Sequence, residues 1–529
     1  MPATKHSRVH LVGGGLASLA AAVLLVRDAG LPGENVRVLE QLPAAGGPPP
    51  GVPAPARAGG YATRGVRMLD EAHCVCLWSL LETIPSPDDP AVSVRRALLA
   101  PAGLPAHARI RVVDGDRTVA DAPESGLDAR DRVDMARLLA LPERLIGSRR
   151  IEDLFRPHFF TTRFWCVWRA TFAFQTWHSA VELKRHLLAF AHRLGGLHTL
   201  PGTRHGGHDP YDSVVRPIRR WLAERGVRTE CGTTVTDADF SGPAARRLSR
   251  LHLRRDGAGT GTIELGEDDY AFLTLGSATA DTTYGDDTTV PELVRDRRDG
   301  SWRLWESVAG NAPDFGRPHA FCGSVDETWR EFFTLTTTCR ALLDHIQKHT
   351  GDIPDEGALV TWKDSRWLLS LEVPARPRLH VPGEDTYTLW GYALAGDVPG
   401  DHVPKRMEDC TGAEVLDELL GHLGLDGIAD EVRSTTGITT VRMPYAGAPF
   451  QRRAAPDRPR VVPDGARNFA FLGRFVELPE GVVSTAEYAV RSAMTAVHHH
   501  FGLDREIPPV YHGLSDADAA RSALSTVFA

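Results

Sequence analysis

The stretch RVHLVGGGLASLAAAVLLVRDAG, residues 8–30, sets the fold class expected for this chain of 529 residues. It begins with an apolar run, Val9 to Val12, which predicts a buried strand and stops at the three glycines Gly13 to Gly15. Residues 16–27 then carry Ala and Leu on every side, which is typical of a buried helix. In a strand, glycine turn and helix in this order, the glycines leave the backbone N–H groups at the helix N-terminus uncovered by side chains. A phosphate group can bind there.

A second strand extends the pattern into a βαβ unit. Residues 35–41, NVRVLEQ, follow a Pro32-Gly33 turn and place Glu40 about 25 positions after the glycines. In dinucleotide-binding units the pyrophosphate rests on the helix N-terminus, and an acidic residue at this spacing accepts hydrogen bonds from a ribose. Ser18 stands at the third glycine position of this pattern and is small enough for close helix–strand packing. We therefore expect a bound dinucleotide, with a glycine turn that holds no ligand as the alternative.

Composition indicates a globular protein with several domains or subdomains, since 42% of the residues are hydrophobic and 24% are charged. The net charge of −8 argues against nucleic acid as a partner, because phosphate binding needs a clustered basic surface. Seven scattered cysteines offer no second pair to complete a zinc site with Cys74 and Cys76, so we expect reduced thiols and no metal. The N-terminal segment lacks a signal-peptide layout, and the apolar run at 16–26 is shorter than the roughly 20 residues that span a bilayer. These features predict a cytoplasmic protein.

Later segments look like returns to the sheet that residues 8–40 begin. Residues 211–226 predict a helix before a strand at 227–240, residues 269–280 contain another buried strand, and residues 468–497 read as strand, loop and helix. We therefore predict an α/β fold: a glutathione-reductase-type, FAD-binding Rossmann-like domain built from discontinuous segments, an inserted α+β substrate domain and a small helical C-terminal region. The predicted limits are 1–80, 205–290 and 440–500 for the nucleotide domain, 81–204 and 291–439 for the substrate region, and 501–529 for the tail.

Two further segments have alternative interpretations. Residues 159–177 carry eight aromatic residues in nineteen positions, which predicts a core helix, or else a wall of an apolar substrate channel. His178, which follows them, is expected to be a satisfied structural histidine rather than a catalyst. The run His498 to His500 is expected to lie on the surface.

Several stretches resemble one family, and they occur in order from residue 8 to about residue 511. The chain resembles the oleate hydratases, also called myosin-cross-reactive antigens, in the segments GGGLASLAAAVLLVRDAGLPGENVRVLE, FWCVWRATFAFQTWHSAVELKRH, YDSVVRPIRRWL, LTLGSATA, VTWKDSRWLLSL, LWGYALAGDVPG, TGAEVLDELLGHL, RMPYAGAPFQRR and FAFLGRFVELPEGVVSTAEYAVRSAMTAV. The resemblance implies an FAD-dependent fatty acid hydratase. Such an enzyme adds water across the cis double bond of a free unsaturated fatty acid, typically at C9–C10, without net redox change.

The residues alone, without the resemblance, favour an oxidoreductase on a lipid or terpenoid. A non-catalytic fatty-acid-binding relative is a third hypothesis. The expected partner is a free, oleate-like fatty acid. We expect at most weak, transient membrane contact, and a monomer or homodimer.

The resemblance also implies which residues contact FAD. Gly13, Gly15 and Ser18 are expected beside the pyrophosphate and Glu40 beside the adenosine ribose. The remaining expected contacts are Gly46, Gly47, Arg64, Gly65 and Val66 in the flavin loop, Val235 on the adenine side, Ser277 at the edge of the nucleotide, and Phe475 beside the isoalloxazine.

Hydration of an isolated alkene needs an acid to protonate one carbon and a base to activate water. Met68 stands where the family has a glutamate acid after its Arg-Gly-Gly-Arg segment, and a thioether donates no proton. Asp70 and Glu71 are therefore candidate acids, with solvated loop carboxylates as the alternative. The family's second catalytic residue is a tyrosine, for which His208 and Tyr211 are the matching positions in HGGHDPYDS. A histidine there serves as acid or base near neutral pH.

Overall fold

A five-stranded parallel sheet forms around the glycine-turn unit in this computed structural model, with the order β18-β11-β1-β2-β7. Its strands are β1 (Val9–Val12), β2 (Val36–Leu39), β7 (Arg228–Glu230), β11 (Tyr270–Thr274) and β18 (Phe469–Leu472). Four of these strands are almost wholly buried, as expected for a parallel sheet covered on both faces. Segments far apart in the sequence therefore build one sheet.

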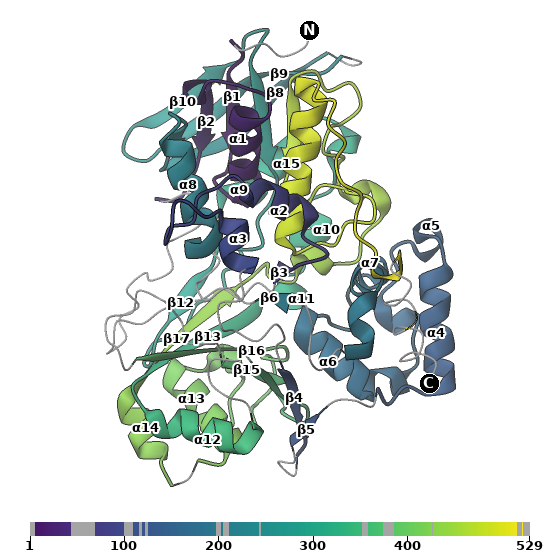
Figure 1. The fold of residues 1–529 in the computed structure, drawn as a ribbon, viewed down its shortest axis with the longest axis vertical. Helices are drawn as coiled ribbons and strands as arrows, with labels where there is room; N and C mark the ends of the chain where they lie inside the picture. The colour runs from purple at the N-terminus through teal and green to yellow at the C-terminus, as the bar shows by residue number, and fades with distance from the viewer. Residues whose placement is uncertain are drawn as a thin grey trace.

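The structure describes residues 6–43, 69–99, 109–115, 119–121, 125–196, 203–204, 211–242, 245–351, 358–373, 386–425, 427–515 and 521. The helices on one face of the parallel sheet include α1 (Leu16–Arg27), α8 (Arg216–Ala223) and α15 (Ala486–Phe501), with α2 (Val75–Leu81) and α3 (Val94–Leu99) beside them (Figure 1). A second layer consists of β8 (Thr233–Ser241), β9 (Arg247–Arg255), β10 (Gly259–Glu264) and α9 (Gly300–Ala309). Together they enclose the main hydrophobic core.

An eight-stranded, mainly antiparallel sheet lies at the opposite end of the molecule (Figure 1). In spatial order it contains β12 (Thr283–Gly285), β17 (Thr436–Met443), β13 (Arg330–Thr337), β16 (Tyr387–Ala393), β15 (Leu369–Val373), β14 (Ala358–Trp362), β4 (Arg109–Val113) and β5 (Val119–Asp121). Helices α12 (Arg340–Thr350), α13 (Gly412–Leu423) and α14 (Ala429–Thr435) cover it and share a core of their own with it.

A group of helices lies beside these two bodies (Figure 1). It consists of α4 (Ala129–Ala140), α5 (Glu143–Ile146), α6 (Arg163–Phe172) and α7 (Ala180–Ala189), while α10 (His319–Cys322) and α11 (Val325–Thr328) are short helices near the junction. The aromatic stretch 159–177 belongs here, and Phe159, Trp165, Trp168 and Phe174 are at most 1% exposed. The core interpretation of this stretch is therefore confirmed for these side chains.

Two strands cross the predicted domain limits, which remain a prediction. β12 falls inside the segment predicted for the nucleotide domain, and β17 contains the predicted limit at residue 440, yet both belong to the eight-stranded sheet. The helical C-terminal region is α15, which ends at Phe501 where Gly502 adopts φ 60°. From 502 to 515 the chain has one further 3₁₀ turn, Gly513–Ser515. No helix among the described residues is long and apolar enough to cross a membrane.

The expectation that His498 to His500 lie on the surface is wrong for two of them. His498 and His500 are buried, because this part of α15 faces the sheet. The Nε2 atom of His500 lies 2.9 Å from the carbonyl oxygen of Phe469 in β18. Packing, rather than polarity, sets the environment of this run.

Candidate active site

The glycine turn after β1 is shaped as an open cradle at the N-terminus of α1. Gly13 adopts φ +88°, and a Cβ atom there would lie 3.3 Å from Thr274 Cβ. Gly15 is the N-cap of α1, and no atom of the described residues lies within 4 Å of where its Cβ would be. The first turn of α1 has no acidic residue, and no side chain in the described part of the chain caps it. Its free N–H groups therefore suit a phosphate.

Glu40 follows β2 and faces this turn. Its Oε2 atom accepts a hydrogen bond from the Gly14 N–H at 2.5 Å, and its Oε1 atom accepts one from the Leu42 N–H at 2.7 Å. Burial raises the pKa of the Glu40 carboxyl. Ser18 lies on the side of α1 that faces the sheet, and its Oγ is 3.0 Å from Thr274 Oγ1. These contacts hold an acceptor beside the glycines and pack α1 closely against β11.

The other described FAD-contact candidates also follow strands of the parallel sheet or flank it. Ser277 follows β11, and its carbonyl oxygen accepts a hydrogen bond from Trp302 Nε1 at 3.1 Å. Phe475 follows β18, is 1% exposed, and packs against Trp302 with ring centroids 4.8 Å apart. Val235 is buried in β8. Ligands of open α/β sheets bind at the carboxyl ends of the strands, and Gly13, Glu40, Ser277 and Phe475 all lie there.

Gly46, Gly47, Arg64, Gly65 and Val66 lie outside the described residues. The remaining residues fit a dinucleotide, because the Gly15 cradle is open where a pyrophosphate would rest. Gly13, Gly15 and Glu40 would hold it.

A short antiparallel pair brings the two segments with catalytic candidates together. β3 (Leu69–Asp70) pairs with β6 (Thr203–Arg204), with Leu69 opposite Arg204 and Asp70 opposite Thr203. His208 lies outside the described residues, as does the side chain of Tyr211, whose backbone begins a π-helical turn, Tyr211–Val215. The pairing nevertheless places the chain before His208 beside the chain that carries Asp70 and Glu71.

The two candidate acids have different surroundings. Asp70 is 5% exposed, forms an ion pair with Arg193, and lies 3.3 Å from His192 Nε2. Burial works against ionisation, but the hydrogen bond from His192 and the charge of Arg193 outweigh it and lower the pKa of Asp70 to about 2. Asp70 is therefore ionised at neutral pH and a poor proton donor. Glu71 is exposed, and its carbonyl oxygen accepts a hydrogen bond from Trp78 Nε1 at 3.0 Å.

Comparison with known proteins assigns the chain to a family. The sequence profile of the MCRA family matches residues 6–498. The chain belongs to the MCRA family. It is 34% identical over 521 residues to the oleate hydratase of Streptococcus pyogenes serotype M49 (strain NZ131), covering 96% of this chain and 87% of that protein. The linoleate hydratase of Lactiplantibacillus plantarum is 29% identical over 538 residues. The match covers 94% of this chain and 94% of that protein. This MCRA-family member is an enzyme of the hydratase class, which confirms the resemblance drawn from the sequence.

Solved structures share the fold of this MCRA-family chain. An oxidoreductase from Methanosarcina mazei has a TM-score of 0.54 at 12% identity, covering 93% of this chain and 100% of its own. Cyclohexylamine oxidase from Brevibacterium oxydans IH-35A has a TM-score of 0.54 at 13% identity. The match covers 94% of this chain and 100% of the oxidase chain. At this identity the likeness shows the fold alone. It confirms the predicted Rossmann-like α/β fold.

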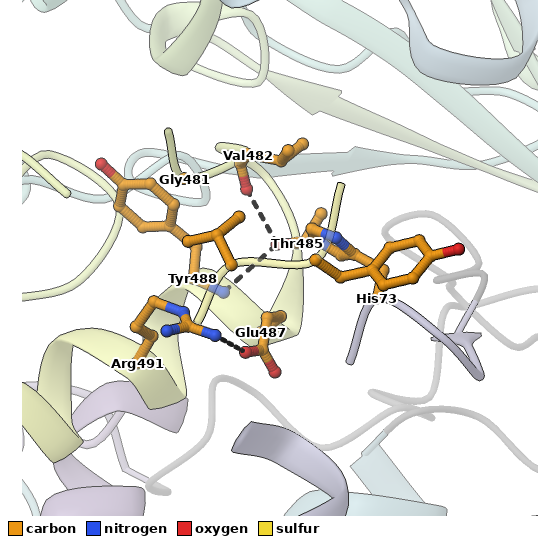
Figure 2. Close-up of a pocket in the computed structure, with 9 residues that line it drawn as sticks. His73, Gly481, Val482, Thr485, Glu487, Tyr488 and Arg491 are labelled. Atoms are coloured by element: carbon orange, nitrogen blue, oxygen red, sulfur yellow. Dashed lines mark hydrogen bonds and ion pairs between the residues drawn. The ribbon is translucent and has the colours of Figure 1, made fainter. Parts of the chain in front are cut away.

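The structure of the MCRA-family chain adds His73, which the sequence motifs did not single out. His73 lies between β3 and α2, is 2% exposed, and neither ring nitrogen has a hydrogen-bond partner in the described part of the chain. Burial lowers the pKa of His73 to about 4. It lines a cavity of about 10 Å³ together with Glu487 and Arg491, which form an ion pair at 3.0 Å (Figure 2). This volume suits about one water molecule.

A second polar group lies beside Glu40 and consists of Gln41, Asp281 and Asp299. No sequence motif singled out these residues. Gln41 Nε2 donates a hydrogen bond to Asp299, and Gln41 Oε1 accepts one from the Gly300 N–H at 3.0 Å. Asp281 accepts a hydrogen bond from the Asp299 N–H at 2.8 Å. Burial and the charge of Asp299 raise the pKa of Asp281 to about 6. These contacts tie α9 to the carboxyl end of β2, and only long-range packing creates them.

Two clusters of ionisable groups resemble metal-ligand sets but serve the fold. Asp128, Asp131 and His158 gather at the start of α4, where Asp128 caps the helix. Asp401, Glu418 and His422 gather at α13, where Glu418 accepts backbone hydrogen bonds at 2.7–2.8 Å. Their oxygens are already used, so neither cluster is assigned a metal.

Proposed function

We propose that this MCRA-family member is a fatty acid hydratase that adds water across the cis-9 double bond of oleate, or of a related free unsaturated fatty acid. The proposed product is the 10-hydroxy fatty acid. The observation that carries the proposal is the match, over nearly the whole chain, to relatives named oleate hydratase and linoleate hydratase.

The proposed cofactor is FAD, required without net redox change. Gly13 and Gly15 would receive the pyrophosphate and Glu40 a ribose, since the cradle is open and the carboxylate lies beside it. FAD, when bound, supplies an electrostatic or structural element of the site. Bound there, FAD would lie at the carboxyl ends of β1 and β2.

The proposed proton-transfer groups come from the paired segments around β3 and β6. Protonation of an alkene carbon needs a group that still carries its proton at neutral pH. Because Asp70 is ionised, we assign it a positioning role through Arg193. Glu71, His208 and Tyr211 remain the candidates for proton donation and water activation.

One incubation tests the function. The enzyme, FAD and a reductant are mixed with oleate in ¹⁸O-labelled water, and the products are analysed by mass spectrometry. A labelled hydroxy fatty acid supports the hydratase. An oxidised or desaturated product would instead support an oxidoreductase, which the fold of the solved neighbours favours as the second candidate. Bound but unchanged oleate would indicate a fatty-acid-binding protein.

Substitutions then separate the candidate groups. The change Glu71→Gln, His208→Ala or Tyr211→Phe is expected to lower turnover roughly 10²–10⁴-fold where the residue acts as general acid or base. FAD binding, followed by flavin fluorescence, should be unchanged in each variant. Full activity in all three would contradict every proton-transfer assignment, while leaving the family and the cofactor proposal intact.

A further inference from the structure

His73 is a buried histidine whose ring has no hydrogen-bond partner, at either nitrogen, in the described part of the chain. Burial lowers its pKa to about 4, so at neutral pH the ring carries one N–H donor and one acceptor nitrogen. The Phe190 ring packs against it with centroids 5.2 Å apart and satisfies neither atom. Buried polar atoms in native proteins are almost always hydrogen-bonded, to the protein or to ordered water. The His73 ring therefore calls for a partner with both donor and acceptor capacity.

The cavity that His73 lines suits such a partner. Its volume is about 10 Å³, and Glu487 and Arg491 line it as well (Figure 2). Val510 and Tyr511, from the chain that follows α15, are also in its lining. A volume of this size holds about one water molecule, which needs two to four polar partners. An imidazole nitrogen, a carboxylate and a guanidinium supply them.

Glu487 connects this cavity to α2. Its Oε1 atom accepts hydrogen bonds from the Cys76 N–H at 3.1 Å and from Arg491 Nη2 at 3.0 Å. Its Oε2 atom accepts one from the Leu77 N–H at 2.9 Å. A carboxylate on α15 therefore satisfies N–H groups in the first turn of α2, which have no partner within that helix. A carboxylate has about four acceptor sites, so capacity remains for a hydrogen bond from a water molecule.

His73 also belongs to the turn that carries the candidate acids. Its backbone N–H donates a hydrogen bond to Asp70 Oδ1 at 2.6 Å, and the Cys74 N–H donates one to the Asp70 carbonyl oxygen at 3.1 Å. Asp70 is itself held by its ion pair with Arg193. The turn is thus fixed at its first residue, and the His73 ring extends from its other end into the cavity. Glu71 lies between these two points.

The chain after α15 joins the same arrangement. The two Nη atoms of Arg491 donate hydrogen bonds to the carbonyl oxygens of residues 508–509. Tyr511 lies edge-on to His192 with ring centroids 5.3 Å apart, and His192 Nε2 lies 3.3 Å from Asp70 Oδ2. These contacts hold the segment beside both the cavity and the turn.

We propose that His73, Glu487 and Arg491 bind one water molecule, and that this water makes His73 a positioning residue for the candidate acid Glu71. The water exchanges one hydrogen bond with the ring and donates another to the Glu487 carboxylate. With the turn held at Asp70 and at His73, the backbone of Glu71 is confined between them. A reacting group misplaced by about 1 Å loses up to about 100-fold in rate. The inference rests on the proposed function, in which Glu71 is one of the groups assigned to proton transfer.

A high-resolution crystal structure of the FAD-loaded protein tests the water site independently of catalysis. One ordered water should lie within about 2.7–3.2 Å of a His73 ring nitrogen and of a polar atom of Glu487 or Arg491. An empty cavity, or a His73 ring bonded directly to another protein group, would overturn the proposal.

The change His73→Phe keeps a planar ring and removes both nitrogens. In oleate hydration it should lower kcat about tenfold or more, while the KM for oleate and the affinity for FAD change little, because only the placement of the acid is altered. His73→Gln restores a donor and an acceptor and should recover part of the loss. An unchanged kcat in His73→Phe, or an equal loss in KM or FAD affinity, would overturn the positioning role.

His500→Phe is the matched control for the loss of a buried imidazole. His500 also lies on α15, and its Nε2 atom is 2.9 Å from the carbonyl oxygen of Phe469. The variant should unfold at a lower temperature but keep a kcat near that of the wild type. A fall in kcat as large as that in His73→Phe would mean that both changes act through general stability, and would overturn the proposal.

The two kinds of measurement separate a failure of this site from a failure of the proposed function. If the wild-type protein hydrates no oleate, the proposed function fails, and the crystal structure still decides whether the water site exists. If oleate is hydrated and the water is present, but Glu71→Gln keeps full activity, the water serves the fold alone and the positioning role is overturned.

Discussion

Gly13 and Gly15 lie two residues apart in one turn, yet their substitution by alanine should have different effects. Gly13→Ala forces a side chain onto φ +88° and against Thr274 Cβ at 3.3 Å, so the fold itself should lose about 1–3 kcal/mol. Gly15→Ala meets no atom of the described residues within 4 Å and should leave the protein without FAD nearly as stable as wild type. Its methyl group would occupy the cradle and weaken FAD binding. Thermal unfolding with and without FAD measures both effects, and an unchanged FAD affinity in Gly15→Ala would contradict the placement of the pyrophosphate.

Asp70 allows a second prediction about a single residue. Its folded-state pKa of about 2 lies below the ordinary value of 3.8, so its ion pair stabilises the folded protein above pH 4 and the benefit is lost as the pH falls toward 2. Asp70→Asn leaves Arg193 buried without its partner and should lower the free energy of unfolding at pH 7 by about 2 kcal/mol or more. Urea unfolding at pH 7 and at pH 3 measures the difference, which should shrink at the lower pH. Equal stability at pH 7 would refute the pairing.

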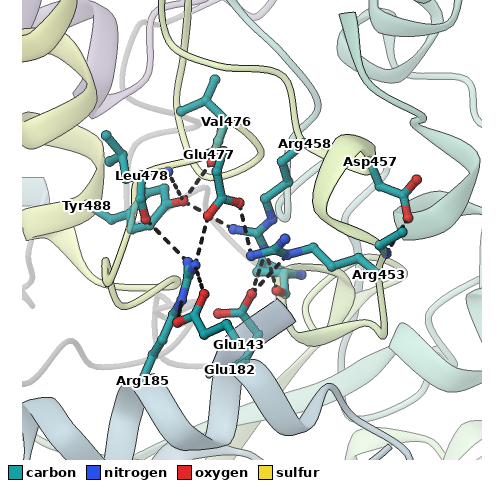
Figure 3. A network of polar contacts seen from close by, with 12 residues as sticks. Glu143, Glu182, Arg185, Arg453, Asp457, Arg458, Val476, Glu477, Leu478 and Tyr488 are labelled. Carbon is teal, nitrogen blue, oxygen red and sulfur yellow. Dashed lines mark hydrogen bonds and ion pairs between the residues drawn. The ribbon is translucent and has the colours of Figure 1, made fainter. Parts of the chain in front are cut away.

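Helix α7 is held to the C-terminal part of the chain by a buried ionic network (Figure 3). Glu182 is 0% exposed and lies 3.1 Å from Arg453 and 3.5 Å from Arg458. Arg185 pairs with Glu143 at 2.7 Å and with Glu477 at 2.8 Å. The network thereby joins the helix that follows the His178 segment to the loops after β17 and β18.

Glu182→Gln should therefore loosen α7 as a unit. The change removes the anion shared by two buried guanidiniums and should cost about 3 kcal/mol or more in urea unfolding. Glu224→Gln, which removes an exposed i,i+4 partner of Arg220, should cost less than about 0.5 kcal/mol. Similar losses in both variants would show that the network contributes little.

At the scale of the whole molecule, buried histidines dominate the expected response to acid. Burial is the main cause that lowers the pKa to about 4 for His10, His73, His186 and His500. A lowered pKa means that the unfolded state binds more protons between pH 4 and 6.5, so stability is present above pH 6.5 and is lost as the pH falls toward 4. Two carboxyl groups act in the opposite direction, because the pKa of Asp281 is raised to about 6 and that of Glu331 to about 7. They are outnumbered by the four histidines.

The slope of stability against pH tests this account. Around pH 5, His500→Gln should reduce the number of protons taken up on unfolding by about one, because that histidine is protonated only in the unfolded state. The slope comes from urea unfolding free energies measured between pH 4.5 and 6.5. An unchanged slope would mean that His500 is already protonated in the folded protein.

Local sequence was sufficient for the βαβ unit from β1 to β2. An apolar run, three glycines and an acidic residue at a set spacing express backbone preferences that act over a few residues, and the structure has β1, α1 and β2 where they were predicted. The cofactor assignment to Gly13 and Glu40 follows from the same short-range pattern. The family, and with it the hydratase class, was also predicted from sequence motifs. Such motifs are contiguous segments, so they can be matched without knowing which distant residues are in contact.

Long-range packing accounts for the features that sequence patterns missed. Arg193, which pairs with Asp70, is more than 100 residues away from it, as Arg453 is from Glu182, and no periodicity in the chain encodes such pairs. The burial of His500 likewise depends on which face of α15 meets the parallel sheet. Charge and desolvation in the assembled interior decide whether a carboxylate is a proton donor or half of an ion pair. That environment exists only once distant segments have packed together.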